Sequence, residues 1–223
     1  MVNIGQFDYI ISISGSDIMA YNTATEIIDF SSTDSRTTFK NVVSALDSTG
    51  GGSCLVKKGT YIMSDTPQSI TLKDNQAWVG EDRDLTRIVG QSTTNEILKR
   101  VFTPLTNFKM SNMTLETNAV STCLYTSGSK DCHFENCVFK FTSPAPSSRF
   151  IVFFDTVNNA NDNERLIVNH CRLEGDTAGQ DMMGSGNMYG CDISNNIFKN
   201  GGGQGIGVNT STGSKYNNNN FYI

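Results

Sequence analysis

The chain lacks both a cluster of basic residues and a long apolar run. Its 17 Lys and Arg are scattered among 22 Asp and Glu, which gives a net charge of −5 and a pI near 5.0. Nucleic-acid-binding proteins gather Lys and Arg on one surface, so we expect no nucleic-acid partner. A membrane helix needs ~20 consecutive apolar residues. No segment approaches that length, so we expect no membrane insertion.

Signals of secretion and of cofactor binding are also missing. Residues 1–6 have neither the basic nor the apolar region of a signal peptide. The six Cys include no Cys-x-x-Cys pair and are spread evenly, which argues against a zinc cluster and a disulfide scaffold. The glycine-rich segment 201–207 lacks the Lys-Ser/Thr of a phosphate-binding loop. We therefore predict free, buried thiols, with no metal and no cofactor.

The N-terminal part of the chain alternates apolar and polar side chains. In residues 7–30 this alternation flanks the turn-forming segment Ser14–Asp17. The pattern is typical of half-buried strands, so it predicts a hairpin followed by another strand. Residues 1–30 are therefore predicted to form an N-terminal hairpin and strand segment, and residues 31–223 a second unit.

That second unit begins with the one predicted helix, at about residues 34–48. Four apolar side chains follow the spacing i, i+3, i+4, i+7, which places them on one helix face: Phe39, Val42, Val43 and Leu46. The three glycines at 50–52 end the helix.

A repeat follows the helix. Five segments each join a turn-forming residue to a strand: 112–115, 136–139, 170–173, 195–198 and 218–221. Their last residues lie 24, 34, 25 and 23 positions apart. The long interval contains the polar runs Ser143–Ser148 and Asn158–Asn163, which predicts an insertion there. Strand, corner and strand repeated every ~20 to 30 residues are typical of a parallel β-helix, whose coils bury their apolar faces against each other.

The corner residues support this interpretation. Four of the five are Asn and the fifth is His170; a sharp bend commonly needs a positive φ, for which Asn, Asp and His are enriched. The residues after the corners are predicted to point inward and stack ~4.8 Å apart, with the Asn forming an amide ladder: Met113, Cys137, Cys171, Asn196 and Asn219. The Cys in this row are thus expected to be small core residues.

The chain resembles the right-handed parallel β-helix proteins of the pectate-lyase-like superfamily, which include tailspike-like proteins of phages and archaeal viruses. The resemblance covers about residues 30–221 and is carried by the helix, the Asn corners and these segments: Gly50–Val56, Lys58–Tyr61, Ile70–Asn75 and Gly80. It implies an all-β solenoid whose helix caps the open end. The superfamily includes lyases, hydrolases, epimerases and non-catalytic spikes, so the fold leaves the activity open.

Acidic residues are the candidates for catalysis, because glycosidases use paired carboxylates and lyases or epimerases need a base and a neighbouring cation. Asp181 begins a predicted strand, and resembling enzymes often carry an acidic residue there. Asp155 ends the strand of the preceding coil, with Asp176 and Glu174 between them and Arg172 pointing outward nearby. The alternative is that these carboxylates are a solvated surface.

The two histidines have structural explanations as well. Imidazole is the usual general base near neutral pH. His170, however, occupies a corner otherwise held by Asn, and His133 is predicted to point outward with no evident partner.

Three functions remain open. The first is a structural and carbohydrate-binding β-helix, spike- or fibre-like, on a virion or extracellular surface. We expect such a protein to bind polysaccharide. We also expect a homo-oligomer, a trimer or fibre, because the last residues 221–223 stop part-way through a coil and leave strand edges open; a further domain, if this chain is a fragment, would cover these edges as well. The second is a polysaccharide lyase, epimerase or glycoside hydrolase. The third is a purely architectural assembly subunit.

Overall fold

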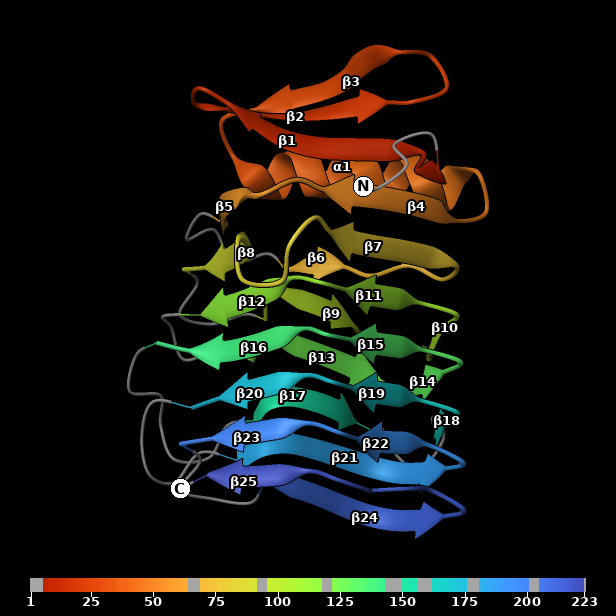
Figure 1. Ribbon diagram of the computed structural model, residues 1–223. Helices are drawn as coiled ribbons and strands as arrows, with labels where there is room; N and C mark the ends of the chain where they lie inside the picture. Colours follow the sequence, from red (N-terminus) through yellow and green to blue (C-terminus); the bar gives the residue numbers. More distant parts are fainter. Residues whose placement is uncertain are drawn as a thin grey trace.

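The computed structural model describes residues 6–63, 69–91, 96–117, 122–142, 150–155, 162–175, 181–200 and 205–222. These residues form a right-handed parallel β-helix of about five turns with one helix (Figure 1). The fold class predicted from the sequence is therefore confirmed. Each coil passes through three parallel sheets, A, B and C, and neighbouring coils pair strand against strand in all three.

Sheet A runs the length of the solenoid. In spatial order it contains β22 (Asp192–Ser194), β19 (Ile167–Asn169), β15 (His133–Glu135), β11 (Lys109–Ser111), β7 (Gln76–Gly80), β4 (Gly52–Val56), β1 (Tyr9–Ser14), β2 (Asp17–Asn22) and β3 (Ile27–Ser32). Sheet B contains β25 (Asn220–Tyr222), β23 (Ile197–Lys199), β20 (Arg172–Glu174), β16 (Val138–Phe141), β12 (Thr114–Thr117), β8 (Thr86–Gly90) and β5 (Gly59–Met63).

Sheet C lies behind the other two in Figure 1 and its strands run in the opposite direction across the view. It contains β10 (Leu105–Thr106), β14 (Ser129–Lys130), β18 (Asn163–Glu164), β21 (Asp181–Tyr189), β17 (Phe150–Asp155), β13 (Leu124–Ser127), β9 (Leu98–Arg100) and β6 (Ile70–Thr71), with β24 (Ile206–Thr212) beside β21. Residues 156–162 separate β17 from β18, whereas Gly128 alone separates β13 from β14. Most of the predicted insertion, in residues 143–149 and 156–161, lies outside the described residues.

The expected N-terminal hairpin is present. Strand β1 pairs antiparallel with β2 and turns between Ser14 and Asp17, and β3 pairs antiparallel with β2. Strand β1 also pairs in parallel with β4, so that Tyr9 lies opposite Cys54. The hairpin thereby continues sheet A past the first coil, at the top of Figure 1.

Helix α1 (Ser35–Ser48) covers the core at the same end. Asp34 caps its N-terminus by accepting a hydrogen bond from the Arg36 amide. Its four predicted apolar residues are all buried. Gln76 from the first coil donates to the helix carbonyl of Val43 over 2.9 Å, which gives a buried polar group a partner. Among the described residues, no helix is long and apolar enough to span a membrane.

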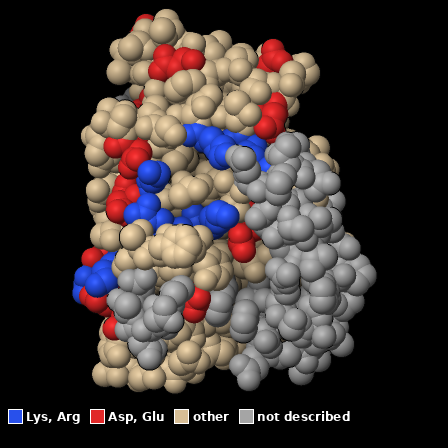
Figure 2. All heavy atoms as spheres, turned by 180° about the vertical axis from the view of Figure 1, so that it is seen from behind, with Lys and Arg blue, Asp and Glu red and all other residues tan. Residues whose placement is uncertain are grey.

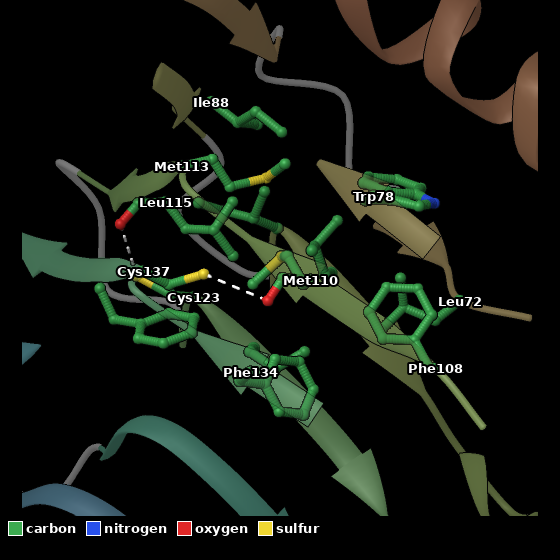
Figure 3. Close-up of a cluster of buried hydrophobic side chains, with 14 of the residues drawn as sticks. Leu72, Trp78, Ile88, Phe108, Met110, Met113, Leu115, Cys123, Phe134 and Cys137 are labelled. Carbon is green, nitrogen blue, oxygen red and sulfur yellow. Dashed lines mark hydrogen bonds between the residues drawn. The ribbon is translucent and has the colours of Figure 1, made fainter. Parts of the chain in front are cut away.

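The core is a continuous stack inside the coils. An aromatic column runs down it, with ring centroids 5.5 to 6.1 Å apart, through Phe39, Trp78, Phe108, Phe134 and Phe154. Figure 3 shows Phe108 and Phe134 in this column, with Leu115 of β12 in the same cluster as Met113 and Cys137, which directly precede strands β12 and β16. Such tilted ring contacts at 4.5–7 Å add to the free energy of apolar burial.

The predicted corners between sheets A and B are confirmed. Five residues there adopt φ values of 51° to 59°: Asn112, Asn136, His170, Asn195 and Asn218. The amide ladder also forms, since Asn196 Nδ2 donates to Asn219 Oδ1 over 3.2 Å in the next coil. All six Cys are free and buried. Burial raises the pKa of the Cys123 and Cys132 thiols to about 12, so they remain protonated core residues.

A second line of corners joins sheet C to sheet A, and the sequence analysis missed it. Its residues also have positive φ, between 51° and 65°: Asn75, Asn107, Asp131, Arg165, Gly190 and Gly213. Side chains bridge neighbouring corners of this line. Asn107 donates to Asn75 over 3.1 Å, and Arg165 binds both carboxylate oxygens of Asp131 at 2.6 and 2.7 Å.

The inward position of Cys137 can be tested by substitution. Cys137 is fully buried, and Cys171 of the next coil contacts its thiol. We predict that Cys137→Asp does not fold, because it buries an unpaired carboxylate, whereas Cys137→Ala folds with a loss of about 1 kcal/mol in unfolding free energy. Circular dichroism during heating distinguishes them. A soluble Asp variant with a cooperative melting transition would contradict this coil register.

Candidate functional site

The outer face of sheet C brings together polar side chains from successive coils. The strand register aligns one backbone position per coil along the solenoid: Thr71, Lys99, Tyr125, Phe153, Gly184 and Gly207. The first three of these carry polar side chains. Tyr125 points outward, because Leu124 and Thr126 on either side of it are fully buried. Strand spacing of ~4.8 Å sets the distance between successive members of the row.

Tyr125 and Asp155 form the central contact of this face. The Tyr125 hydroxyl donates to Asp155 Oδ2 over 2.7 Å, from β13 to the end of β17 in the next coil. Burial, and then the hydrogen bond to Asp155, raise the pKa of Tyr125 to about 12, while a hydrogen bond with Ser127 acts in the opposite direction. At neutral pH the phenol is therefore protonated and acts as a hydrogen-bond donor rather than as a base.

Lys99 lies directly beside Tyr125, on β9. Its ammonium group makes no hydrogen bond or ion pair with the part of the chain that the structure describes. The adjacent Arg100 is used structurally, since its guanidinium donates to the Leu72 carbonyl over 3.2 Å and lies 3.4 Å from Asp74. Figure 2 views the molecule from behind and shows Lys and Arg side chains across the upper part of this face.

These contacts define the candidate site, which we call the sheet C row: Lys99, Tyr125 and Asp155. Asp155 lies two residues beyond Phe153 on β17, opposite Ser127, and reaches the aligned positions through its hydrogen bond with Tyr125. It offers a cation, a phenol and a carboxylate from three adjacent strands, β9, β13 and β17. Such groups bind hydroxyl and carboxylate groups of a sugar polymer through hydrogen bonds and ion pairing.

The structure places Asp181 away from Asp155. Asp181 begins β21 opposite Phe150, whereas Asp155 ends β17 five residues later. With a rise of ~3.3 Å per residue, their backbones are roughly 16 Å apart along the strands. Their backbones thus lie at opposite ends of neighbouring strands rather than side by side. The site role of Asp181 stays a prediction.

Arg172 lies on another sheet. It extends from β20 of sheet B, where its guanidinium lies 2.9 Å from Glu174 and 3.4 Å from Asp84. Asp84 has a pKa below its ordinary value, because Arg83 binds it and Arg172 adds a second positive charge. The structure therefore does not bring Arg172 beside Asp155. Asp176 lies outside the described residues.

Neither histidine belongs to the sheet C row. His170 is a corner residue, as described above, and His133 lies on β15 of sheet A with its Nε2 3.8 Å from Glu135. In the described ranges no group of three or more His, Cys, Asp or Glu side chains is placed to hold a metal ion.

Sequence reasoning missed Lys99 and Tyr125. The segment Cys123–Ser127 does not alternate apolar and polar residues, so it gave no signal for an outward Tyr125. The repeat that was found aligned the strands of sheets A and B only, so it gave no register for sheet C.

Comparison with known proteins supports the fold. No family model and no curated protein matches the chain. Among solved structures, the A-module of the Azotobacter vinelandii mannuronan C-5 epimerase AlgE4 has a TM-score of 0.54 at 15% identity, over 78% of this chain and 55% of that one. The AlgE6 A-module of the same organism has a TM-score of 0.49 at 16% identity, over 83% and 61%.

A third structure is ORF18 of Geobacillus virus E2, with a TM-score of 0.48 at 13% identity, over 85% of this chain and 59% of that one. This chain thus spans between half and two thirds of the length of these three structures. The resemblance to pectate-lyase-like β-helices expected from the sequence is confirmed at the level of the fold.

The contact between Tyr125 and Asp155 can be tested by titration. We predict that Asp155→Asn lowers the pKa of Tyr125 from about 12 towards its ordinary 10.0, without reaching it, because burial is the larger cause. Since folding raises this pKa, the stability that the phenol contributes is present below about pH 10 and is lost as the pH rises towards 12.

Carbon-13 NMR of the tyrosine Cζ atoms measures each phenol separately. Asp29→Asn is the matched control, because Asp29 accepts a hydrogen bond from Tyr9, whose pKa is also about 12. That variant is expected to lower the pKa of Tyr9 and leave Tyr125 unchanged. An unaltered Tyr125 titration in Asp155→Asn would refute the assigned contact.

Proposed function

We propose that this β-helix binds an extended polysaccharide along sheet C. The observation that carries the proposal is the sheet C row, in which a cation, a phenol and a carboxylate come from three adjacent strands. A polymer lying along the solenoid meets side chains of successive coils at a regular spacing of ~4.8 Å. The fold shared with a mannuronan C-5 epimerase module is consistent with a polysaccharide ligand.

Binding is favoured over catalysis by the protonation state of Tyr125. A phenol with a pKa of about 12 stays neutral at physiological pH. Because its one O–H proton is donated to Asp155, its oxygen can accept a hydrogen bond from a sugar hydroxyl. It is poorly matched to proton abstraction, for which a pKa near the working pH is best.

The biological setting that we propose is display on a virion or cell surface, as a spike- or fibre-like protein. A solenoid suits this role because its flank presents the same face coil after coil. We further propose a homo-oligomer, a trimer or fibre. Its support is exposed apolar surface, since Phe221 and Tyr222 on β25 are more than half exposed.

A polysaccharide lyase, epimerase or glycoside hydrolase is the second candidate. The observation in its favour is again the sheet C row, because Lys99 supplies a cation near a hydrogen-bonded phenol and carboxylate. Lyases and epimerases need a cation to stabilise the charge that develops on the sugar carboxylate.

Binding to a panel of acidic and neutral polysaccharides tests the first proposal. We predict that the wild type binds at least one acidic polymer, that Lys99→Met weakens this binding about tenfold or more, and that Tyr125→Phe weakens it about threefold to tenfold. Tyr21→Phe, on the remote strand β2, is the control and is expected to bind normally. If both sheet C variants bound the polymer as tightly as the wild type, the proposed site would be overturned. If the wild type bound no polymer, an architectural subunit would be favoured.

The same incubations test for catalysis. Unsaturated products are followed by absorbance, new reducing ends by a colorimetric assay and C5 inversion by proton NMR. Under the binding proposal no product accumulates. Product that disappears in Asp155→Asn would establish an enzyme that uses the sheet C row, and product that disappears only in Asp181→Asn would place the chemistry at the start of β21.

A further inference from the structure

A second candidate site, which is concave, lies on the opposite side of the solenoid. Where sheets A and B meet, the surface contains a hollow of about 660 Å³ lined by Arg83, Asn112, Glu135, Asn136, His170 and Arg172, among others. In Figure 1 this corner faces the viewer and sheet C lies behind it. The hollow is therefore separated from the sheet C row by the whole core.

One wall of the hollow is the connection between β7 and β8. A Cβ at Gly80 would lie 2.0 Å from the Asn112 carbonyl oxygen, so glycine is needed where this connection leaves the coil. Asp82 then accepts hydrogen bonds from the amides of Asp84 and Leu85, at 3.0 and 3.1 Å, which fixes the turn. This rigid turn holds Arg83 over the corners of the next two coils.

Ion pairs fix the two arginines of the hollow. Arg83 Nη1 donates to Asn136 Oδ1 over 3.1 Å and Nη2 lies 3.1 Å from Asp84. Arg172 lies between Asp84 and Glu174, as described above. The guanidinium groups are thus oriented before any ligand arrives, which reduces the entropy lost on binding.

The corner ladder is interrupted inside this hollow. Asn136 donates to Asn112 over 2.8 Å, and Asn218 donates to Asn195 over 3.2 Å. His170 stands between these two pairs, and within the described part of the chain its side chain has no hydrogen-bond or ion-pair partner. The imidazole therefore retains its donor and acceptor positions at the hollow. The neighbouring amides are already engaged, Asn136 with Asn112 and Arg83, and Asn195 with Asn169 and Asn218.

The charge balance indicates the class of ligand. Arg83 and Arg172 supply two positive charges, while Asp84, Glu135 and Glu174 supply three negative ones. The positive charges are already paired, so an anionic ligand gains little attraction there and meets the exposed carboxylate of Glu135. A ligand rich in hydroxyl groups uses both the donors and the acceptors without adding charge.

From the joint arrangement of the oriented arginines, the interrupted ladder and this charge balance, we propose that the hollow binds one residue of a neutral saccharide. Asn112, Asn136 and His170 form its floor, with Arg83 as donor and Glu135 as acceptor at its sides. The hollow can bind this ligand whether or not a polymer is bound at the sheet C row. Its proposed ligand is neutral, whereas the polymer proposed for the sheet C row is acidic.

The test uses methyl glycosides of glucose, galactose and mannose as probes, with nitrogen-15 NMR of the Asn side-chain amides and Arg Nε groups. We predict saturable shifts at Asn112, Asn136 and Arg83 with at least one glycoside. His170→Asn is the informative variant, because Asn is the residue native to the other corners and keeps the backbone conformation. We expect it to weaken binding about threefold to tenfold, and Glu135→Ala to do the same.

Tyr125→Phe separates this site from the sheet C row and is expected to leave the glycoside titration unchanged. Three results would each overturn the proposal. They are chemical shift changes confined to sheet C residues, no chemical shift changes with any neutral glycoside, and undiminished affinity for the glycoside in both His170→Asn and Glu135→Ala. A preference for methyl glucuronide over methyl glucoside would also overturn it, since it would require an anion-binding site.

Discussion

From the coil of β11 and β12 onward, the solenoid depends on two backbone corners in each coil where a residue adopts a positive φ. Gly accepts this conformation because it has no Cβ, and among L-residues Asn, Asp and His accept it most readily. Asn occupies most of these corners. Each corner turns the chain by a fixed amount between two strands. The following strand is then in register with the equivalent strand of the preceding coil, so the hydrogen bonds between coils and the stacked core both follow from the corners.

Both candidate sites are consequences of this register. The sheet C row exists because successive strands place Lys99, Tyr125 and Asp155 at neighbouring positions on one face. The hollow exists because one corner holds His170 instead of Asn, and because an earlier coil replaces its single-residue corner with the turn that carries Arg83. In each site the side chains are held by strands or fixed turns, as a preorganised binding surface requires.

The sequence predicted the parts of the fold whose spacing is regular. The Asn corners between sheets A and B were visible because one residue type recurs just before a strand, and helix α1 was visible from four apolar residues on one face. The second corner line was harder to find, because Asp131 and Arg165 replace Asn there. The contact between Tyr125 and Asp155 was not predictable, since the connections from sheet B strands to sheet C strands, residues 118–123, 142–149 and 175–180, differ in length.

The most direct test of this account compares Gly and Ala at a corner. At Asn195, where φ is 59°, both variants lose the same side-chain hydrogen bonds and differ only in the Cβ. We predict that urea denaturation shows Asn195→Gly to be more stable than Asn195→Ala by roughly 1 kcal/mol. At Lys109, an exposed position in β11, the order should be reversed. If the Ala variant were more stable than the Gly variant at Asn195 as well as at Lys109, the claim that positive φ at the corners governs the fold would be contradicted.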